Sequence, residues 1–295
     1  MRRSAAMRAT TVGIMANAFL LVLKGAATGL SDSLTIFSET LNSLADLLTA
    51  FVVLICVRWA WMSPDEEHPF GHRRAEPIAG LLAAIFTGIL GFEVCRTAII
   101  DLWHGNLPAH IGRYPILALC ITALLKFALA RYFAGTGQAL NSPAIRATAV
   151  DCRNDVLIAM QGLFAVVVAN YELRSLDTLA ALVVGVYILY SGYRVGMENI
   201  DYLMGKAPDR DLLDRIRTAA AGVTGVHEVD DVLAHYVGTF IHVELTARVD
   251  GTLTTAESHD VAEATRHAVE SVGLVHRAFV HIEPAKASRA ASQPN

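Results

Sequence analysis

Six stretches of the chain are dominated by apolar residues and are separated by shorter polar segments. A helix that crosses a lipid bilayer needs about 20 mostly apolar residues, and each of these stretches is of about that length or longer. The pattern therefore predicts six membrane-spanning helices. Their approximate bounds are residues 10–30, 34–59, 77–100, 116–133, 143–169 and 176–201.

The second and fifth stretches are the least apolar of the six, because acidic and amide side chains lie inside them. The second carries Glu39, Asn42 and Asp46, and the fifth carries Asp151 and Asp155. Such segments fit either an amphipathic helix of a soluble protein or a spanning helix with a polar inner face. The apolar runs AFVVLICV and VLIAMQGLFAVVVA that follow the acids favour the spanning helix.

The pattern changes after residue 204, where shorter amphipathic segments follow one another. Helical spacing in DLLDRIRTAAAGV and in TTAESHDVAEATRHAVESV predicts two helices, the second with Thr254 or Thr255 as N-cap. Residues 226–234, 240–249 and 278–282 read as strands. The order α-β-β-α-β predicts a ferredoxin-like or metallochaperone-like α/β domain with its helices on one face of a sheet.

The predicted fold class is thus an α-helical membrane protein, a six-transmembrane-helix bundle with a C-terminal cytosolic α/β domain. We expect residues 1–204 to form the transmembrane domain and residues 205–285 to form a regulatory and dimerisation domain. Residues 286–295 (KASRAASQPN) are polar and of low complexity, which predicts a disordered tail.

Charge is distributed unevenly along the chain. Only 18% of residues are charged, against about 25% in a typical soluble protein. Residues 205–295 carry 9 basic and 13 acidic side chains, which accounts for the formal net charge of −4. An acidic tail of this kind argues against a nucleic-acid partner. Lys and Arg gather on one side of the predicted helices, which places both termini in the cytosol and the chain in the inner (cytoplasmic) membrane.

Acidic side chains at helical spacing define the first candidate site. Asn42 and Asp46 are four residues apart and share one helix face, and Asp151 and Asp155 repeat that spacing on another helix. Together the two helices offer three carboxylates and an amide oxygen, which are ligands that hard divalent cations prefer. The alternative is a hydrogen-bonded polar seam between helices. Because a charge inside a bilayer costs from about 2.5 kcal/mol upward, we favour the cation site. Glu39 is an accessory acid or faces interfacial water.

Histidines define two further candidates. Asp65, His68 and His72 lie in the loop after the second helix, where two imidazoles four apart and a carboxylate can bind a metal ion; the alternative is an ordinary charged loop. Seven of the eleven histidines lie in the tail, near Asp230, Asp231, Glu244 and Glu283. That density suggests regulatory metal binding. The four cysteines form no CxxC pair and read as small buried side chains.

Three segments resemble motifs of the cation diffusion facilitator family. GLSDSLTIFSETLNSLADLL is similar to the signature of the second helix, HPFGHRRAEPIAGLL to the signature that joins the loop to the third helix, and NSPAIRATAVDCRNDVLIA to the signature of the fifth. The resemblance covers nearly the whole chain. It implies a homodimer joined through the tail and proton-coupled alternating access.

The resemblance also implies three metal sites. The family's transport site falls on Asn42, Asp46, Asp151 and Asp155. Its loop site falls on Asp65, His68 and His72. Its dimeric tail site falls on Asp230, Glu244, His259, His281 and Glu283, with His242 as the alternative to Glu244.

Selectivity is suggested by a departure from the zinc-associated members, which usually have a His in the transport site. Here the corresponding positions hold Asn42 and Asp151. Imidazole suits zinc, whereas carboxylate and carbonyl oxygens suit manganese. The all-oxygen set therefore favours Mn²⁺ or Fe²⁺, with Zn²⁺ as the alternative because zinc also accepts carboxylates.

The predicted function is proton-coupled efflux of a divalent transition-metal cation. The partners expected are the metal ions, protons, a second copy of the chain and the lipid bilayer, with no enzymatic cofactor. A membrane metal sensor or scaffold that binds without transport is the alternative. An intramembrane hydrolase needs an HExxH motif or a nucleophile with its base, and the chain offers neither.

Overall fold

The computed structural model describes residues 2–31, 34–104, 113–169 and 174–285. It divides the chain into two compact units, the helical unit Met1–Leu203 and the C-terminal unit Met204–Asn295. Each unit is described by itself. The segment 286–295, for which the sequence predicts disorder, lies outside the described residues.

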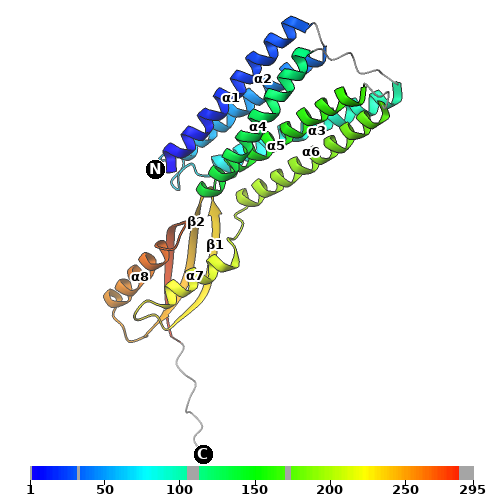
Figure 1. Cartoon of the computed structure of the whole chain (residues 1–295). Helices are drawn as coiled ribbons and strands as arrows, with labels where there is room; N and C mark the ends of the chain where they lie inside the picture. Colours follow the sequence, from blue (N-terminus) through cyan, green and yellow to red (C-terminus); the bar gives the residue numbers. More distant parts are fainter. Residues whose placement is uncertain (1, 32–33, 105–112, 170–173, 286–295) are drawn as a thin grey trace, which may run out of the picture. The chain divides into compact units, whose positions relative to one another are not determined.

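Six long helices make up the helical unit (Figure 1). Among the described residues, five of them, α1, α2, α3, α4 and α6, are long and apolar enough to cross a membrane. In α5, Arg146, Asp151, Arg153 and Asp155 all lie in the first half of its 27 residues, and an apolar run follows them. The helices are α1 (Arg2–Ser31), α2 (Leu34–Ala60), α3 (Ala75–His104), α4 (Arg113–Leu140), α5 (Pro143–Ala169) and α6 (Arg174–Leu203).

The charged helix α5 is the central element of the unit, because it contacts each of the other five helices. Its two acids therefore face neighbouring helices rather than the surface. Asn154, between them, is fully buried and donates from Nδ2 to the Ser191 hydroxyl of α6 at 2.8 Å. The alternative of a soluble amphipathic helix does not fit this central position, and the polar inner face predicted for α5 does.

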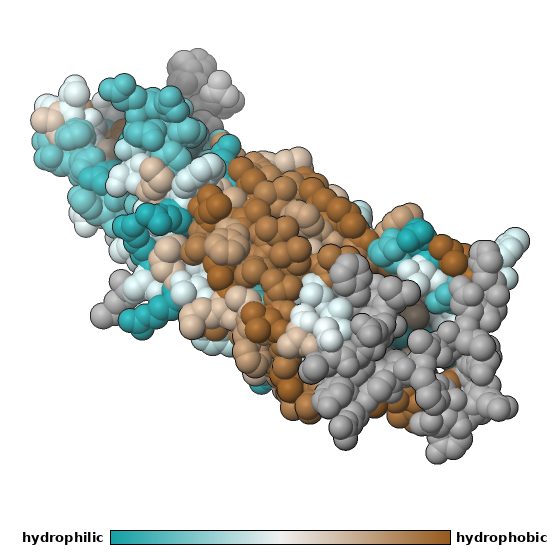
Figure 2. All heavy atoms as spheres, turned by 90° about the horizontal axis from the view of Figure 1, so that it is seen from above, coloured by the Kyte–Doolittle hydropathy of each residue, from teal (hydrophilic) through white to brown (hydrophobic). Residues whose placement is uncertain are grey.

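The outer surface of the helical unit is largely apolar. Figure 2 shows hydrophobic side chains covering the face of this unit that is turned to the viewer. Large side chains such as Val22, Leu124 and Val183 are more than two-thirds exposed, which a soluble protein would avoid in such numbers. A surface of this kind is compatible with lipid as its solvent.

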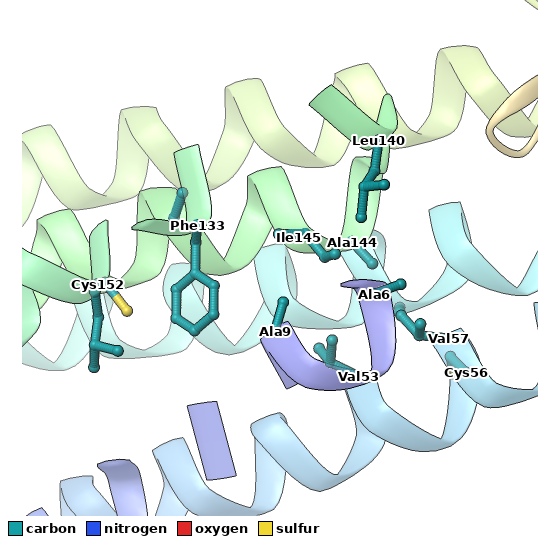
Figure 3. Packing of buried hydrophobic residues seen from close by; sticks show 13 residues of the cluster. Ala6, Ala9, Val53, Cys56, Val57, Phe133, Leu140, Ala144, Ile145 and Cys152 are labelled. Carbon is teal, nitrogen blue, oxygen red and sulfur yellow. The ribbon is translucent and has the colours of Figure 1, made fainter. Parts of the chain in front are cut away.

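Small residues allow the helices to approach closely. Ala6, Ala9 and Ala144 line the cluster around Phe133 shown in Figure 3. Helix α3 packs against α6 through glycines: a Cβ at Gly185 would lie 2.6 Å from the Cys95 sulfur. Such glycines bring backbones together where the hydrophobic effect offers no driving force between helices. The described cysteines are free and are buried or half-buried, as the sequence indicates.

The ends of two helices differ from the predicted ones. Helix α1 begins at Arg2 rather than near residue 10, and α4 continues to Leu140 rather than ending near residue 133. The extension of α4 contains Gly137, a weak helix former. A Cβ there would lie 2.9 Å from the Arg146 side chain and 3.0 Å from its backbone nitrogen, so a glycine lets α4 pass close to the start of α5.

The C-terminal unit has the predicted α-β-β-α-β order. Strands β1 and β2 pair antiparallel, β2 and β3 pair parallel, and the sheet order is β1-β2-β3. Alternate residues of β2, from Ile241 to Ala247, pack with Ile216 and Val269 of the helices, so both helices cover one face of the sheet. The elements are α7 (Arg210–Ala221), β1 (Glu228–Val237), β2 (Phe240–Val249), α8 (Thr255–Glu270) and β3 (Val275–Pro284).

Both helices of this unit begin at residues with capping side chains. Asp209 accepts the Leu212 N–H at the start of α7. Thr254 is the N-cap of α8 and forms a capping box with Glu257, which settles the choice between the two threonines. The backbone N–H of Thr254 lowers the pKa of Glu257.

Candidate metal centres

Three carboxylates from two helices meet inside the helical unit. Asp46 of α2 and Asp151 and Asp155 of α5 each offer an oxygen, and these oxygens all lie within 4.8 Å of one another. The spacing of four residues along α5 is what turns both of its acids to one face. We call these three residues the acid cluster. Its oxygens are close enough for one cation to be shared among them.

Neighbouring polar groups hold the acid cluster in place. Thr87 of α3 donates from its hydroxyl to Asp151 Oδ1 at 3.3 Å. Asn17 of α1 donates to the backbone carbonyl of Asp46 at 3.2 Å. Oδ1 of Asp155 is buried and has no hydrogen-bond partner among the residues that the structure describes. A buried acceptor of this kind is what a cation would satisfy.

A basic residue that the sequence analysis did not single out lies against the acid cluster. Nζ of Lys126 in α4 is 2.9 Å from Asp46 Oδ2 and 2.5 Å from Asp155 Oδ2. The Lys126 side chain is 1% exposed. The signal available in the sequence was a lysine in the middle of an apolar helix, which the cost of intramembrane charge marks as functional.

Two cavities border the acid cluster. The larger has a volume of about 510 Å³, is lined by Asn42, Asp46 and Asp151, and continues to Asp101 near the end of α3 and Asp177 near the start of α6. The smaller, of about 10 Å³, is lined by Asn42, Asp46 and Asp155 and by polar residues of α1 and α4: Lys24, Thr122 and Lys126. Asn42, predicted as the fourth ligand, lines both cavities together with Asp46. Glu39 belongs to α2, but its side chain lies outside the described part of the structure.

The loop residues also come together. His68 Nδ1 lies 3.4 Å from Asp65 Oδ1, and His72 Nε2 lies 3.3 Å from Asp65 Oδ2. The two imidazole rings are 4.4 Å apart. Gly71, with φ 80°, makes the turn that brings His72 back toward His68. We call Asp65, His68 and His72 the loop cluster; its ligand atoms all lie within 4.8 Å of one another.

Hydrogen bonding keeps the carboxylate of the loop cluster charged. The backbone N–H of His68 donates to Asp65 Oδ1 at 2.7 Å. This bond, followed by the charges of His72 and His68, lowers the pKa of Asp65. The loop cluster is exposed to water, in contrast to the acid cluster.

The residues predicted for the tail site lie on the uncovered face of the sheet and on α8. Glu244 and His281 line a shallow pocket with Asp231. His242 is buried, and its ring centroid lies 6.0 Å from that of His235 and 6.4 Å from that of His276. His259 is exposed on α8. Among the described residues of this one chain, the predicted tail ligands do not gather three ligand atoms within 4.8 Å.

Two of the predicted tail ligands are instead paired with an arginine. Arg248 of β2 contacts Asp230 of β1 through Nη2, and the same nitrogen lies 3.1 Å from Glu283 of β3. The hydrogen bond to Asp230 is the main cause that raises the pKa of Arg248. These are cross-strand pairs, the ordinary unit of sheet stabilisation.

Comparison with family models matches the whole of this architecture. Residues 10–204 match the cation efflux transmembrane domain, and residues 208–285 match the cytoplasmic domain of cation efflux proteins. The chain is therefore a multi-pass membrane transporter and not an enzyme. It belongs to the cation efflux, or cation diffusion facilitator, family.

Relatives extend over nearly the full length of the chain. It is 27% identical to the manganese efflux system protein MneS of Bacillus subtilis over 86% of both chains. It is 28% identical to the cation-efflux pump FieF of Cronobacter sakazakii, over 95% of this chain and 92% of that one. A solved C-terminal domain of MamM in a nickel form is 29% identical, with a TM-score of 0.26, over 26% of this chain and all of that one.

Proposed function

We propose that the protein exports Mn²⁺ or Fe²⁺ from the cytosol in exchange for protons, with Zn²⁺ as the alternative cargo. The observation that carries the proposal is the acid cluster: three carboxylates from α2 and α5 share one space inside the helical unit. Asn42 adds an amide oxygen one turn from Asp46. We assign Asn42, Asp46, Asp151 and Asp155 as the ligands of the transported ion.

The choice of metal follows from the ligand atoms. An all-oxygen set suits manganese better than zinc, which prefers sites with imidazole or thiolate. Two relatives carry manganese efflux in their names, MneS and MneP of Bacillus subtilis, the second 25% identical over 96% of this chain. These names support Mn²⁺ as the first ion to test.

The route of exit follows from the larger cavity. The excess of Lys and Arg on one side of the helices places both termini in the cytosol of an inner-membrane protein. On that topology the end of α3 and the start of α6 are on the outside. The cavity leads from Asp46 and Asp151 to Asp101 and Asp177 at that side, so acids line the path along which a released cation would leave.

Protons drive the release of the metal in this proposal. Carboxylates bind either a metal or a proton, so metal binding releases protons and protonation expels metal. Neighbouring acids in a dry site repel one another when all are charged, which favours uptake of protons once the metal has left. An inward proton gradient then biases the cycle toward export.

We assign the loop cluster and the tail as regulatory metal sites. The loop cluster has the geometry for this within one chain. The tail ligands, Asp230, Glu244 or His242, His259, His281 and Glu283, require a second copy of the chain to complete a site. A homodimer joined through the C-terminal unit meets that requirement and agrees with the cytoplasmic-domain match.

The test is metal flux in proteoliposomes that hold the purified protein under an imposed pH gradient. Mn²⁺, Fe²⁺ and Zn²⁺ are compared while the internal pH is recorded. We expect Mn²⁺ or Fe²⁺ flux with opposing proton movement in the wild type. Asp46→Ala should show neither, whereas Glu66→Ala, which removes an exposed loop carboxylate, should retain both.

The outcomes separate the components of the proposal. Flux of Zn²⁺ alone would keep the exchanger and reject the selectivity argument. Metal flux without proton movement would reject the coupling. Binding of metal without flux of any ion would replace the transporter with a sensor or scaffold.

A further inference from the structure

The lysine against the acid cluster is the least expected feature of the helical unit. Lys126 comes from α4 and contacts carboxylates from two other helices, Asp46 of α2 and Asp155 of α5. It is one of the largest fully buried side chains among the described residues. Burying a charge at this position is costly unless the charge is paired, and here it is paired twice.

The ammonium group lies where the cargo would bind. Carboxylate oxygens approach hard divalent ions at about 2.0–2.6 Å. Nζ of Lys126 is at 2.5 and 2.9 Å from one oxygen each of Asp155 and Asp46. A metal ion bridging the same two oxygens and Lys126 in its present position would therefore compete for the same space.

The type of basic residue suits displacement. Lysine is a point charge at the end of a flexible four-carbon stem, whereas arginine holds acids through a rigid fork. The small cavity beside Lys126, which Asp46, Asp155, Asn42 and Lys24 also line, extends to Thr122, Ile158 and Ala159 and has room for about one water-sized group. The ammonium group can swing into this space while α4 stays where it is.

We propose that Lys126 is a tethered cation that occupies the metal site when the site is empty and is displaced when the metal binds. The inference rests on the proposed transport function and adds a step to it. The carrier returns through the membrane with the Lys126 ammonium, in place of metal, on Asp46 and Asp155. Lys126 also supplies one of the positive charges that protons alone would otherwise have to provide during that return.

Lys126 should matter for net efflux of metal and not for exchange of metal for metal. Net efflux into a metal-free bath requires the site to return empty, and so requires Lys126. Exchange of metal for metal, with the same concentration on both sides, never requires an empty site to cross. Loss of the Lys126 charge should therefore impair net efflux more than exchange, and should also remove a competitor for the metal.

The experiment compares the wild type with Lys126→Met in proteoliposomes at the same alkaline pH on both sides, where protons are scarce. Net Mn²⁺ efflux and exchange of radioactive Mn²⁺ are measured, and Mn²⁺ affinity is measured by equilibrium dialysis in detergent. In Lys126→Met we expect the ratio of net efflux to exchange to fall by about tenfold and the affinity to rise by about tenfold. Arg131→Met, which removes an exposed positive charge from the same helix, should leave both values unchanged.

An unchanged ratio, or an affinity equal to or weaker than that of the wild type, would overturn the proposal. If Lys126→Met is not recovered as a monodisperse protein, Lys126→Gln, which removes the charge but keeps a polar amide, is measured in its place. If the wild type transports no metal, the proposed function fails. The affinity comparison still decides whether Lys126 competes for the site.

Discussion

A basic side chain lies between two acidic ones both in the helical unit and in the sheet of the C-terminal unit, and the two ion-pair arrangements differ. In the helical unit, Lys126 lies between Asp46 and Asp155, dry and beside a small cavity. In the sheet, Arg248 of the central strand β2 lies between Asp230 and Glu283 on the face that the helices leave uncovered. The ammonium group of a lysine is a point charge on a flexible chain and can be exchanged for a metal ion. The planar guanidinium group of an arginine has several donors and holds its partners in place.

The difference shows that a cluster of acids does not define a metal site by itself. Asp230 and Glu283 have a structural reason to be where they are, because each forms an ion pair with Arg248 of a neighbouring strand. Asp46 and Asp155 come from different helices, and no ladder of backbone hydrogen bonds explains their meeting. The membrane acids are therefore the stronger candidates for ligands of a transported ion.

The largest effect should come from removing an acid that Lys126 contacts. Asp155→Ala deletes a ligand and leaves the Lys126 ammonium with one carboxylate, so we expect Mn²⁺ flux to fall by about 100-fold or more. Flux is measured in proteoliposomes after the variant has been shown to be monodisperse. Wild-type flux in Asp155→Ala would remove the acid cluster from the transport mechanism.

A smaller effect should follow from changing the type of ligand. Asp151→His puts an imidazole into the oxygen set, which should shift the preference from Mn²⁺ toward Zn²⁺ by about tenfold. The matched control is Asp151→Asn, which keeps an oxygen ligand and should weaken transport of both ions without changing their ratio. Equal ratios in the two variants would show that selectivity arises elsewhere.

In the sheet, removing the paired cation should act mainly on stability. Arg248→Met leaves three acids on adjacent strands, Glu228, Asp230 and Glu283, without their arginine, so we expect the thermal midpoint of the C-terminal unit to fall by a few degrees. Metal binding by the full-length protein should rise only slightly. Arg217→Met, at an exposed position of α7, serves as the control. A large gain in metal affinity would make Arg248 a counterpart of Lys126.

The smallest effect concerns the loop cluster, where the acid Asp65 contacts two imidazoles rather than an arginine or a lysine. The pKa of Asp65 is lowered, so its titration by NMR in metal-free buffer should have a midpoint below the usual value of about 3.9. The ionised Asp65 carboxylate therefore stabilises the folded state above the pKa that this group has in the unfolded chain. This stabilisation is lost as the pH falls through the pKa of Asp65 in the folded protein. Because the backbone N–H of His68 is the main cause, His68→Ala should keep most of the shift. A midpoint at or above 3.9 would contradict the loop geometry.

Much of the fold follows from the pattern of apolar residues. Apolar runs long enough to span a bilayer are compatible with few structures other than a helix, and alternating apolar and polar residues with few other than a strand. The apolar pattern predicts that the fourth helix ends near residue 133, yet α4 continues to Leu140 and packs closely at Gly137 against the start of α5. Such an approach depends on a residue distant in sequence, Arg146, which no local pattern contains.

The acid cluster was predictable, because helical spacing places Asp151 and Asp155 on one face and bilayer energetics give them a purpose. The contact with Lys126 was not, because it requires knowing which face of α4 turns toward α2 and α5. In the tail, the acids and histidines suggest metal ligands by composition. Within one chain, two of these acids, Asp230 and Glu283, form ion pairs with Arg248, and those contacts depend on strands that are distant in sequence.

The charge of α5 has a consequence for biosynthesis. A nascent helix that carries Arg146, Asp151, Arg153 and Asp155 is a poor substrate for insertion into lipid on its own. Its polar groups find partners on α3 and α4, which leave the ribosome earlier, and on α6, which follows. We expect α5 to enter the bilayer late, against neighbours that are already assembled, so that substitutions in α4 can reduce the yield of inserted protein without touching a metal ligand.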